Sequence, residues 1–431
     1  MTVQQKAFKS RRRYNQWVTN QTLEDFALRY TPVSARRWSA KRVVMTALSA
    51  ITFLALEAIG GALTLTYGFN YVVVAVILVS IIIFALSMPI AINAAKNGLD
   101  IDLLTRGAGF GYLGSTVTSL IYASFTFIFF ALEAAIMAMA LNMLFGLPLH
   151  FGYLIGSVVV IPLVTWGFTF ISRFQQFTQF CWLALQLLPF IFILIREHHV
   201  LQNWIDFPGF ITARDGSFDF LQLGAVCSVL LSLVSQVGEQ VDQVRFLPKP
   251  QHPARWRWYG AVIAAGPGWV VIGAIKILLG SFLAVLAFNY GLGAELASEP
   301  THMYLVAFSY VTHSSSTLLA LTGIFVVLSQ LKINVTNAYA GSIAWSNFFL
   351  RLTHRHPGRV VWLFFNVGIA LLLMELGVYR VFEDILGIYA VAATSWLGSV
   401  VADITLNKWL KLRPAEIEFR RAYLYEDRKS V

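Results

Sequence analysis

Residues 43–66 read VVMTALSAITFLALEAIGGALTLT, an apolar run whose one charged residue is Glu57. An α-helix needs about 20 apolar residues to cross the hydrocarbon core of a bilayer, so this run is long enough to span a membrane. Glu57 and the adjacent pair Gly60-Gly61 interrupt it. A carboxylate loses its hydration in lipid, and glycine in a helix costs backbone entropy. The run therefore predicts a membrane helix whose Glu57 faces protein.

Nine further runs of this kind follow, in a chain of 431 residues that is 57% hydrophobic and 13% charged. Soluble domains carry about 25% charged residues, so this composition indicates that lipid is the solvent. The ten predicted spans are 43–66, 70–94, 116–145, 151–172, 176–195, 219–240, 258–288, 314–345, 360–378 and 381–405. The apolar stretch from Met303 to Thr312 is too short to span, and we predict a surface helix there, outside the membrane.

Basic residues gather on one side of these predicted spans. The chain has 32 lysines and arginines, and with the N-terminus inside nearly all of them fall on inner segments. The exceptions are Arg196, Arg214 and Arg380 outside, and Lys276 and Lys332 within spans. By the positive-inside rule, we expect both termini to be cytoplasmic and the membrane to be the inner membrane. The net charge of +10 is then a topology signal, and we expect a lipid bilayer and no nucleic acid as partner.

The spans divide into two halves of five, which is the pattern of an inverted repeat. We predict a basic arm (1–42), a first half (43–195), an external connection (196–218), a second half (219–405) and a basic tail (406–431). In such folds the first helix of each half is often broken near the midplane. Acidic, glycine-containing interruptions at 55–61 and 235–242 predict these breaks. The alternative for Gly60-Gly61 is close helix packing alone.

Polar residues inside other spans indicate a binding site. Phe129 and Glu133 are four apart, so they share one helical face. A flat heterocycle would stack on the ring while the carboxylate accepts its N–H groups. The alternative is a core phenylalanine and a glutamate paired with a lysine. Lys276 and Lys332 are both buried cations in this interpretation, Lys276 snorkelling or structurally paired.

The span at 314–345 carries two polar stripes. Gln330, Asn334 and Asn337 form one, and Ser329, Lys332 and Thr336 form the other. A mid-span lysine costs about 2.5–3.5 kcal/mol on insertion scales, so we expect Lys332 to have an acidic partner. The candidate partners are Glu57, Glu133, Glu239 and Asp242. We expect these charged groups to converge on one shared polar cavity.

Catalytic and nucleotide motifs are missing from the sequence. There is no Walker motif, HExxH, nucleophile elbow or CxxC, and the glycine-rich stretch 107–114 follows no predicted strand. We therefore expect no enzyme activity, no cofactor and no metal site.

Several passages resemble the nucleobase–cation symporter family, which includes purine, cytosine, allantoin and hydantoin permeases. They are Arg106–Gly114, Asp242–Arg245, Gln330–Ser342, Ala402–Lys408 and Ile417–Ala422. The resemblance implies an all-α membrane protein with a ten-helix, 5+5 inverted-repeat core of the leucine-transporter type. It also implies alternating access and a ring bound between helices 1, 3, 6 and 8. The family usually has twelve helices, so helices 11 and 12 are absent, and we expect a short form or a fragment.

The resemblance and the polar stripes together define an expected substrate site. Its members are Glu57, Gly60, Phe129, Glu133, Ser232, Leu233, Gln236, Gln330, Asn334 and Asn337. In sodium-coupled relatives, backbone carbonyls of helix 1 and hydroxyl residues of helix 8 bind the ion. The matching helix 8 positions here are Ser329, Lys332 and Ile333. The lysine ammonium would take the place of sodium, which implies a transporter that is proton-coupled or uncoupled.

We therefore expect a secondary-active permease for a nucleobase-like compound. The alternative is a ligand sensor on the same fold, without net transport. A channel or a membrane enzyme is disfavoured, because the sequence carries no filter motif and no catalytic constellation.

Overall fold

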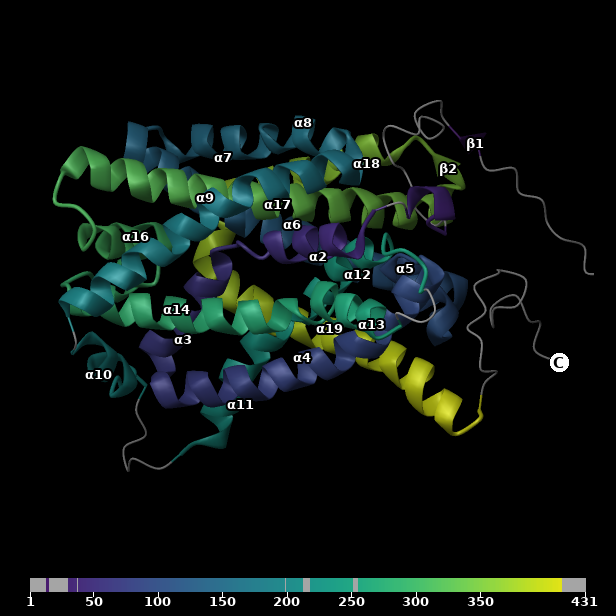
Figure 1. The fold of residues 1–431 in the computed structure, drawn as a ribbon, viewed down its shortest axis with the longest axis horizontal. Helices are drawn as coiled ribbons and strands as arrows, with labels where there is room; N and C mark the ends of the chain where they lie inside the picture. Colours follow the sequence, from purple (N-terminus) through teal and green to yellow (C-terminus); the bar gives the residue numbers. More distant parts are fainter. Residues whose placement is uncertain are drawn as a thin grey trace, which may run out of the picture.

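A computed structural model describes residues 13–14, 30–36, 38–197, 199–211, 218–250 and 255–412. Within these ranges the chain is helical, apart from the short parallel pair β1 (Arg13–Tyr14) and β2 (Arg355–His356). The long helices run side by side along the molecule (Figure 1). Most of the predicted basic arm and basic tail, including Ile417–Ala422, and also Arg214, lie outside the described residues.

The helices of the first half follow the predicted runs closely. They are η2 (Val33–Ala35), α2 (Ala40–Ser49), α3 (Ala55–Tyr67), α4 (Phe69–Asn97), α5 (Ile101–Thr105), η3 (Arg106–Phe110), α6 (Gly111–Phe145), α7 (Leu149–Val158), α8 (Val160–Thr165), α9 (Gly167–Arg196) and α10 (Val200–Ile205). The predicted run 151–172 is wrong at its end. Gly167 has a φ of 73°, a conformation that favours glycine, and the chain turns there into α9.

The second half has the same succession of long helices and short turns. They are α11 (Phe220–Leu231), η4 (Ser232–Ser235), α12 (Gln236–Val244), α13 (Arg255–Ala265), α14 (Trp269–Asn289), α15 (Ala294–Ala297), α16 (Pro300–Ser309), α17 (Ser315–Thr353), α18 (Arg359–Glu375), η5 (Val378–Val381), α19 (Phe382–Ala402) and η6 (Asp403–Asn407).

Seven helical segments in the described residues are long and apolar enough to cross a membrane. The prediction of an all-α, multi-pass membrane protein is thereby confirmed. The other predicted spans correspond to shorter elements: the first to α2 and α3, the fourth to α7 and α8, and the ninth to α18. One end of the bundle carries β2, α5 and the start of α13, and α10 and α16 lie at the other (Figure 1). We call the end with β2 the basic end, because Arg106 and Arg359 begin helices there and Arg351 lies in the last turn of α17.

The helix breaks lie just before the predicted positions. Helix α2 ends at Ser49 and α3 begins at Ala55, so the first break is 50–54 and not 55–61. The second break is the 3₁₀ turn η4, and α12 has already begun at Gln236. Gly60 lies inside α3, where an added Cβ would be 2.0 Å from the carbonyl oxygen of Ile277 on α14. Gly60 therefore allows close helix packing, and its place in the substrate site stays a prediction.

Helix α16 corrects the prediction of a surface helix at Met303–Thr312. It packs against α14 and α17, and the side chains of Met303, Tyr304 and Phe308 are fully buried. Figure 1 shows α16 between these two long helices, at the end away from β2. Its apolar residues are therefore part of the core, although the helix is too short to span a bilayer.

Candidate functional site

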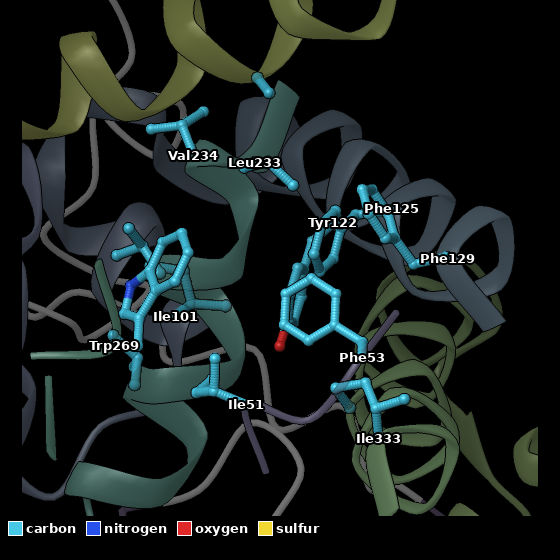
Figure 2. Packing of buried hydrophobic residues seen from close by; sticks show 14 of the residues in the cluster. Ile51, Phe53, Ile101, Tyr122, Phe125, Phe129, Leu233, Val234, Trp269 and Ile333 are labelled. Atoms are coloured by element: carbon cyan, nitrogen blue, oxygen red, sulfur yellow. The ribbon is translucent and has the colours of Figure 1, made fainter. Parts of the chain in front are cut away.

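Aromatic side chains connect the two helix breaks. Phe53, in the first break, lies edge-on to Phe129 on α6, with ring centroids 6.4 Å apart. Phe129 contacts Phe125 at 4.6 Å, and Phe125 lies 6.4 Å from Tyr389 of α19. The Tyr389 hydroxyl is 2.7 Å from that of Ser235 in η4. Both breaks therefore border one aromatic centre, where Figure 2 shows Phe53, Phe125 and Phe129 close together.

Glu133 lies one turn beyond Phe129 on α6 and is fully buried. Its Oε2 accepts a hydrogen bond from the Leu54 backbone N–H at 3.2 Å, and its Oε1 accepts from Ala55 N–H at 3.3 Å. Leu54 is the N-cap residue of α3 and gives no side-chain cap of its own. The carboxylate from α6 therefore satisfies backbone donors that the first break leaves without helical partners.

The amide stripe of α17 serves two purposes. Gln330 reaches the first break, where its Oε1 accepts from Leu54 N–H at 3.4 Å. Asn334 instead donates to the carbonyl oxygen of Phe130 at 3.3 Å, and Asn337 donates to Asn334 at 3.2 Å. The structure therefore brings Gln330 to Glu133, while the two asparagines tie α17 to α6.

The residues predicted from the sixth span lie at the second break. Ser232 donates to the Val229 carbonyl oxygen at 2.6 Å, which is a local helical contact. Gln236 donates to Glu239 at 2.8 Å, within α12. Leu233 helps to line a small apolar hollow that is bounded by α4 and α14. Of these positions, Leu233 is the one that Figure 2 shows beside the aromatic centre.

Glu57 forms a buried ion pair with Lys276 of α14, in which the Nζ and Oε1 atoms are 2.5 Å apart. The Tyr304 hydroxyl of α16 donates to the same carboxylate oxygen at 3.2 Å, and Gln186 of α9 donates to Tyr304 at 2.7 Å. Lys276 is thus structurally paired. Glu57 is engaged by α14 and α16 in a cluster separate from the backbone contacts of Glu133.

Lys332 does not have the predicted acidic partner. Its ammonium donates to the Gln175 carbonyl oxygen and to the Thr178 hydroxyl of α9, each at 3.0 Å. In the described part of the chain it forms no ion pair. Neutral oxygens of the neighbouring helix therefore solvate the Lys332 ammonium. The sequence prediction considered only carboxylates as partners and did not include these oxygens.

The other two predicted ion-site positions adjoin it on α17. The Ser329 hydroxyl accepts from the Trp182 indole N–H at 2.9 Å, and the Thr52 hydroxyl of the first break donates to the Ser329 carbonyl oxygen at 2.9 Å. Ile333 is buried, on the side of Phe53 in Figure 2. This part of α17 therefore lies between the first break and α9.

The shared polar cavity expected for the buried charges stays a prediction. Glu57, Glu133, Glu239 and Lys332 are each fully buried, so none of them faces lipid. Their hydrogen-bond partners are nevertheless different, and no group of three side chains placed to hold a metal ion occurs in the described ranges. Each of these buried groups therefore has its own contacts inside the bundle, and the long-range ones are not revealed by the sequence.

A second network, only partly anticipated by the Asp242–Arg245 motif, closes the basic end. Buried Arg245 lies 3.8 Å from Asp100 at the start of α5 and 3.9 Å from Asp242. The Tyr122 hydroxyl of α6 donates to Asp242 at 3.0 Å. Asn347 of α17 donates to Asp102 at 2.6 Å. These contacts bind α5, α6, α12 and α17 together between the aromatic centre and the basic end.

Residues of α9 were missed by the sequence reasoning. Gln175, Thr178, Trp182 and Gln186 all contact the buried lysines or their partners. All four follow a helical spacing of three or four residues, about one turn. Hydrogen-bonding residues at that spacing in an apolar span are the signal that identifies such a face.

No protein-family model and no curated protein matches this sequence. Solved structures do share its fold. MHP1, a nucleobase-cation-symport-1 family transporter in a closed conformation with bromovinylhydantoin bound, superposes with a TM-score of 0.68 at 16% identity, covering 92% of this chain and 84% of that one. A Na⁺-coupled sialic acid symporter in a substrate-bound outward-open state has a TM-score of 0.61 at 13% identity, over 91% and 84% of the two chains.

A manganese transporter from Eremococcus coleocola is more distant, with a TM-score of 0.53 at 11% identity over 84% and 77% of the two chains. All three neighbours are transporters with different cargoes. The fold is therefore that of helical membrane transporters, and the likeness itself does not specify a cargo.

Proposed function

We propose that this chain is a secondary-active transporter of a nucleobase or a related flat nitrogenous heterocycle. The observation that carries the proposal is the position of Phe129 and Glu133. They lie one turn apart on α6, both buried, beside the broken first helix. An aromatic face next to a carboxylate suits a ring that both stacks and donates N–H groups. MHP1, which has the same fold, holds a hydantoin, and a hydantoin ring is flat and carries such groups.

Alternating access provides the transport step in this proposal. Phe129 is 2% exposed and Glu133 is fully buried, so a ligand reaches them only when the surrounding helices move. The network at Arg245 closes the basic end, and the Glu57–Lys276–Tyr304 cluster joins α3, α14 and α16 towards the opposite end. Opening these two closures in turn would expose the same centre to each side of the membrane.

The proposed motion includes an inverted repeat of five and five helices, which the helix contacts support. Helix α3 packs on α14, and its counterpart α12 packs on α4. Helix α6 packs on α18, and its counterpart α17 packs on α8. Exchange of the two halves therefore preserves the helix contacts, which favours a shared site at the interface of the repeats.

We also propose that sodium is not the coupling ion. The Lys332 ammonium lies between α17 and α9 and is bound by oxygens of the kind that sodium prefers. A tethered cation there competes with a free one by charge and by volume. Coupling to protons and uncoupled exchange then remain as mechanisms. We place the protein in the inner membrane, with both termini in the cytoplasm. A filled cation position also fits the second candidate function, a sensor that binds ligand without moving it.

A binding screen tests the proposal directly. We expect purified protein in detergent to bind at least one of the purines, pyrimidines, allantoin or hydantoins saturably, with equal affinity in sodium and in choline salts. Failure of every ring to bind would contradict the heterocycle assignment. A steep rise of affinity with sodium would contradict the role of Lys332.

A further inference from the structure

We propose that Glu133 is a resident anion at the start of α3 and thereby excludes substrates that carry a carboxylate. This inference deepens the proposed function, because it restricts the ligand of that site to neutral or donor-rich rings. It rests on the proposed function for the ring itself. The anion position, in contrast, is defined by contacts within the protein.

The start of α3 is an electropositive position. The helix has 13 residues and follows the non-helical segment 50–54, so its first backbone N–H groups have no helical acceptors. Aligned peptide dipoles add about half a positive charge at such an end. An anion is therefore stabilised there. Two N–H groups at this end, those of Leu54 and Ala55, donate to the Glu133 carboxylate.

Gln330 provides a second, independent sign of a ligand position. Its Oε1 accepts from Leu54 N–H at 3.4 Å, while its Nε2 is buried and has no hydrogen-bond partner. A buried amide donor without an acceptor is costly. Because the two atoms belong to one planar amide, this free donor lies at the same break. It is available to a carbonyl oxygen of a bound ring.

The surrounding charges leave no place for a second anion. The Lys276 ammonium is already paired with Glu57 at 2.5 Å, and the ammonium of Lys332 is directed to α9. A substrate carboxylate at the start of α3 would therefore meet the carboxylate of Glu133 without a compensating cation. The position that would otherwise attract an acid substrate repels it here.

Matched ligands test the selectivity. Uracil and orotate share a ring and differ by one carboxylate, and hydantoin and hydantoin-5-acetate differ by one carboxymethyl group. We expect the unmodified protein to bind the neutral member of a pair and to discriminate against the acid. Glu133→Gln keeps the shape and removes the charge, and it should shift the affinity ratio towards the acid by about tenfold or more. Glu239→Gln, which neutralises another fully buried carboxylate, should leave the ratio unchanged.

Equal binding of acid and neutral rings by the unmodified protein would overturn the inference. So would a shift in Glu133→Gln no larger than that in Glu239→Gln. If no neutral ring binds, the heterocycle proposal fails, and the following measurement decides the anion site alone.

Chemical rescue tests the resident anion without any heterocycle. Glu133→Ala vacates the position, and acetate should then raise the thermal midpoint of the purified protein saturably at constant ionic strength against chloride. We expect no such acetate effect on the unmodified protein or on Glu239→Ala. An equal response of Glu133→Ala and Glu239→Ala would overturn the inference. Should Glu133→Ala not fold, Glu133→Ser replaces it in the same comparison.

Discussion

At the scale of single residues, buried charge is handled in two ways in this protein. Lys276 has a carboxylate partner in Glu57, whereas Lys332 is solvated by the neutral oxygens of Gln175 and Thr178. A buried ion pair and a buried lone ammonium respond differently to mutation, because loss of one ion leaves the other uncompensated. This difference gives the first prediction.

Either single substitution, Glu57→Gln or Lys276→Met, should lower the free energy of unfolding by about 3–5 kcal/mol, since each leaves a buried charge unpaired. The double variant should be more stable than at least one single variant. Denaturant titration in detergent micelles measures all three. Additive losses in the double variant would show that the two side chains do not interact.

Phe129→Ala should weaken binding of a heterocycle by about 1–3 kcal/mol, the usual loss when an aromatic platform for a base is removed. Phe127→Ala is the matched control. Phe127 lies on the same helix but stacks on Trp345, with centroids 6.1 Å apart. Isothermal titration compares the two variants, and an equal loss in both would remove Phe129 from the site.

The sequence was informative about which residues are buried and uninformative about their partners. Glu133 and Phe129 were predicted to share one helical face because their spacing is local, and both are buried. The partner of Lys332 was missed, because Gln175 is 157 residues away and carries no charge. Hydrogen bonds to neutral backbone oxygens leave no compositional signal in a single sequence.

At the scale of elements, glycine in α3 allows a close helix contact and does not cause the helix break. An added Cβ on Gly60 would meet the Ile277 backbone, and one on Gly280 of α14 would meet the Glu57 backbone at 2.2 Å. Reciprocal small residues of this kind let two membrane helices approach closely. The break at 50–54 contains no glycine, and its Leu54 N–H is bound by Glu133 and Gln330.

Gly60→Ala should therefore destabilise the protein by about 1–3 kcal/mol, the usual cost of overpacking. Gly368→Ala in α18 is the control, since an added Cβ there has no neighbour within 4 Å. That substitution should be neutral or stabilise by up to about 1 kcal/mol, because alanine favours helix. Thermal unfolding of both variants measures the difference. Equal midpoints would contradict the close contact between α3 and α14.

The displaced breaks show why element boundaries were only partly predictable. Acidic and glycine residues near 55–61 and 235–242 correctly indicated the neighbourhood of two broken helices. The exact turns depend on side chains of α6 and α17 that accept from the Leu54 N–H, and on Tyr389 of α19, whose hydroxyl contacts that of Ser235. Those contacts arise only on folding, so local sequence places the breaks to within about a turn.

At the scale of the whole molecule, hydropathy predicted a helical membrane protein. The contacts that close the two ends of the bundle depend instead on long-range packing. Arg245 links α12 to α5 through Asp100 across the basic end. Helix α16, predicted as a surface element, is instead packed into the opposite end. Hydropathy indicates which segments are apolar, whereas the packing of a short apolar helix depends on the surrounding bundle.

Arg245→Gln should loosen the basic end. A reporter at Gln236→Cys, in a Cys181→Ser/Cys227→Ser background, lies in a buried position of α12. Its labelling by a membrane-impermeant thiol reagent applied from the basic end should rise several-fold, because opening exposes α12. Arg255→Gln, at an exposed arginine of α13, is the control. Equal labelling rates in both variants would show that Arg245 does not hold this end closed.

Counterflow in proteoliposomes tests the central claim most directly. Vesicles loaded with an unlabelled ring that binds should accumulate the labelled ring from outside, without sodium on either side. The account predicts saturable, transient accumulation that Phe129→Ala reduces. Saturable binding with no exchange across the bilayer would contradict the account and identify the protein as a sensor.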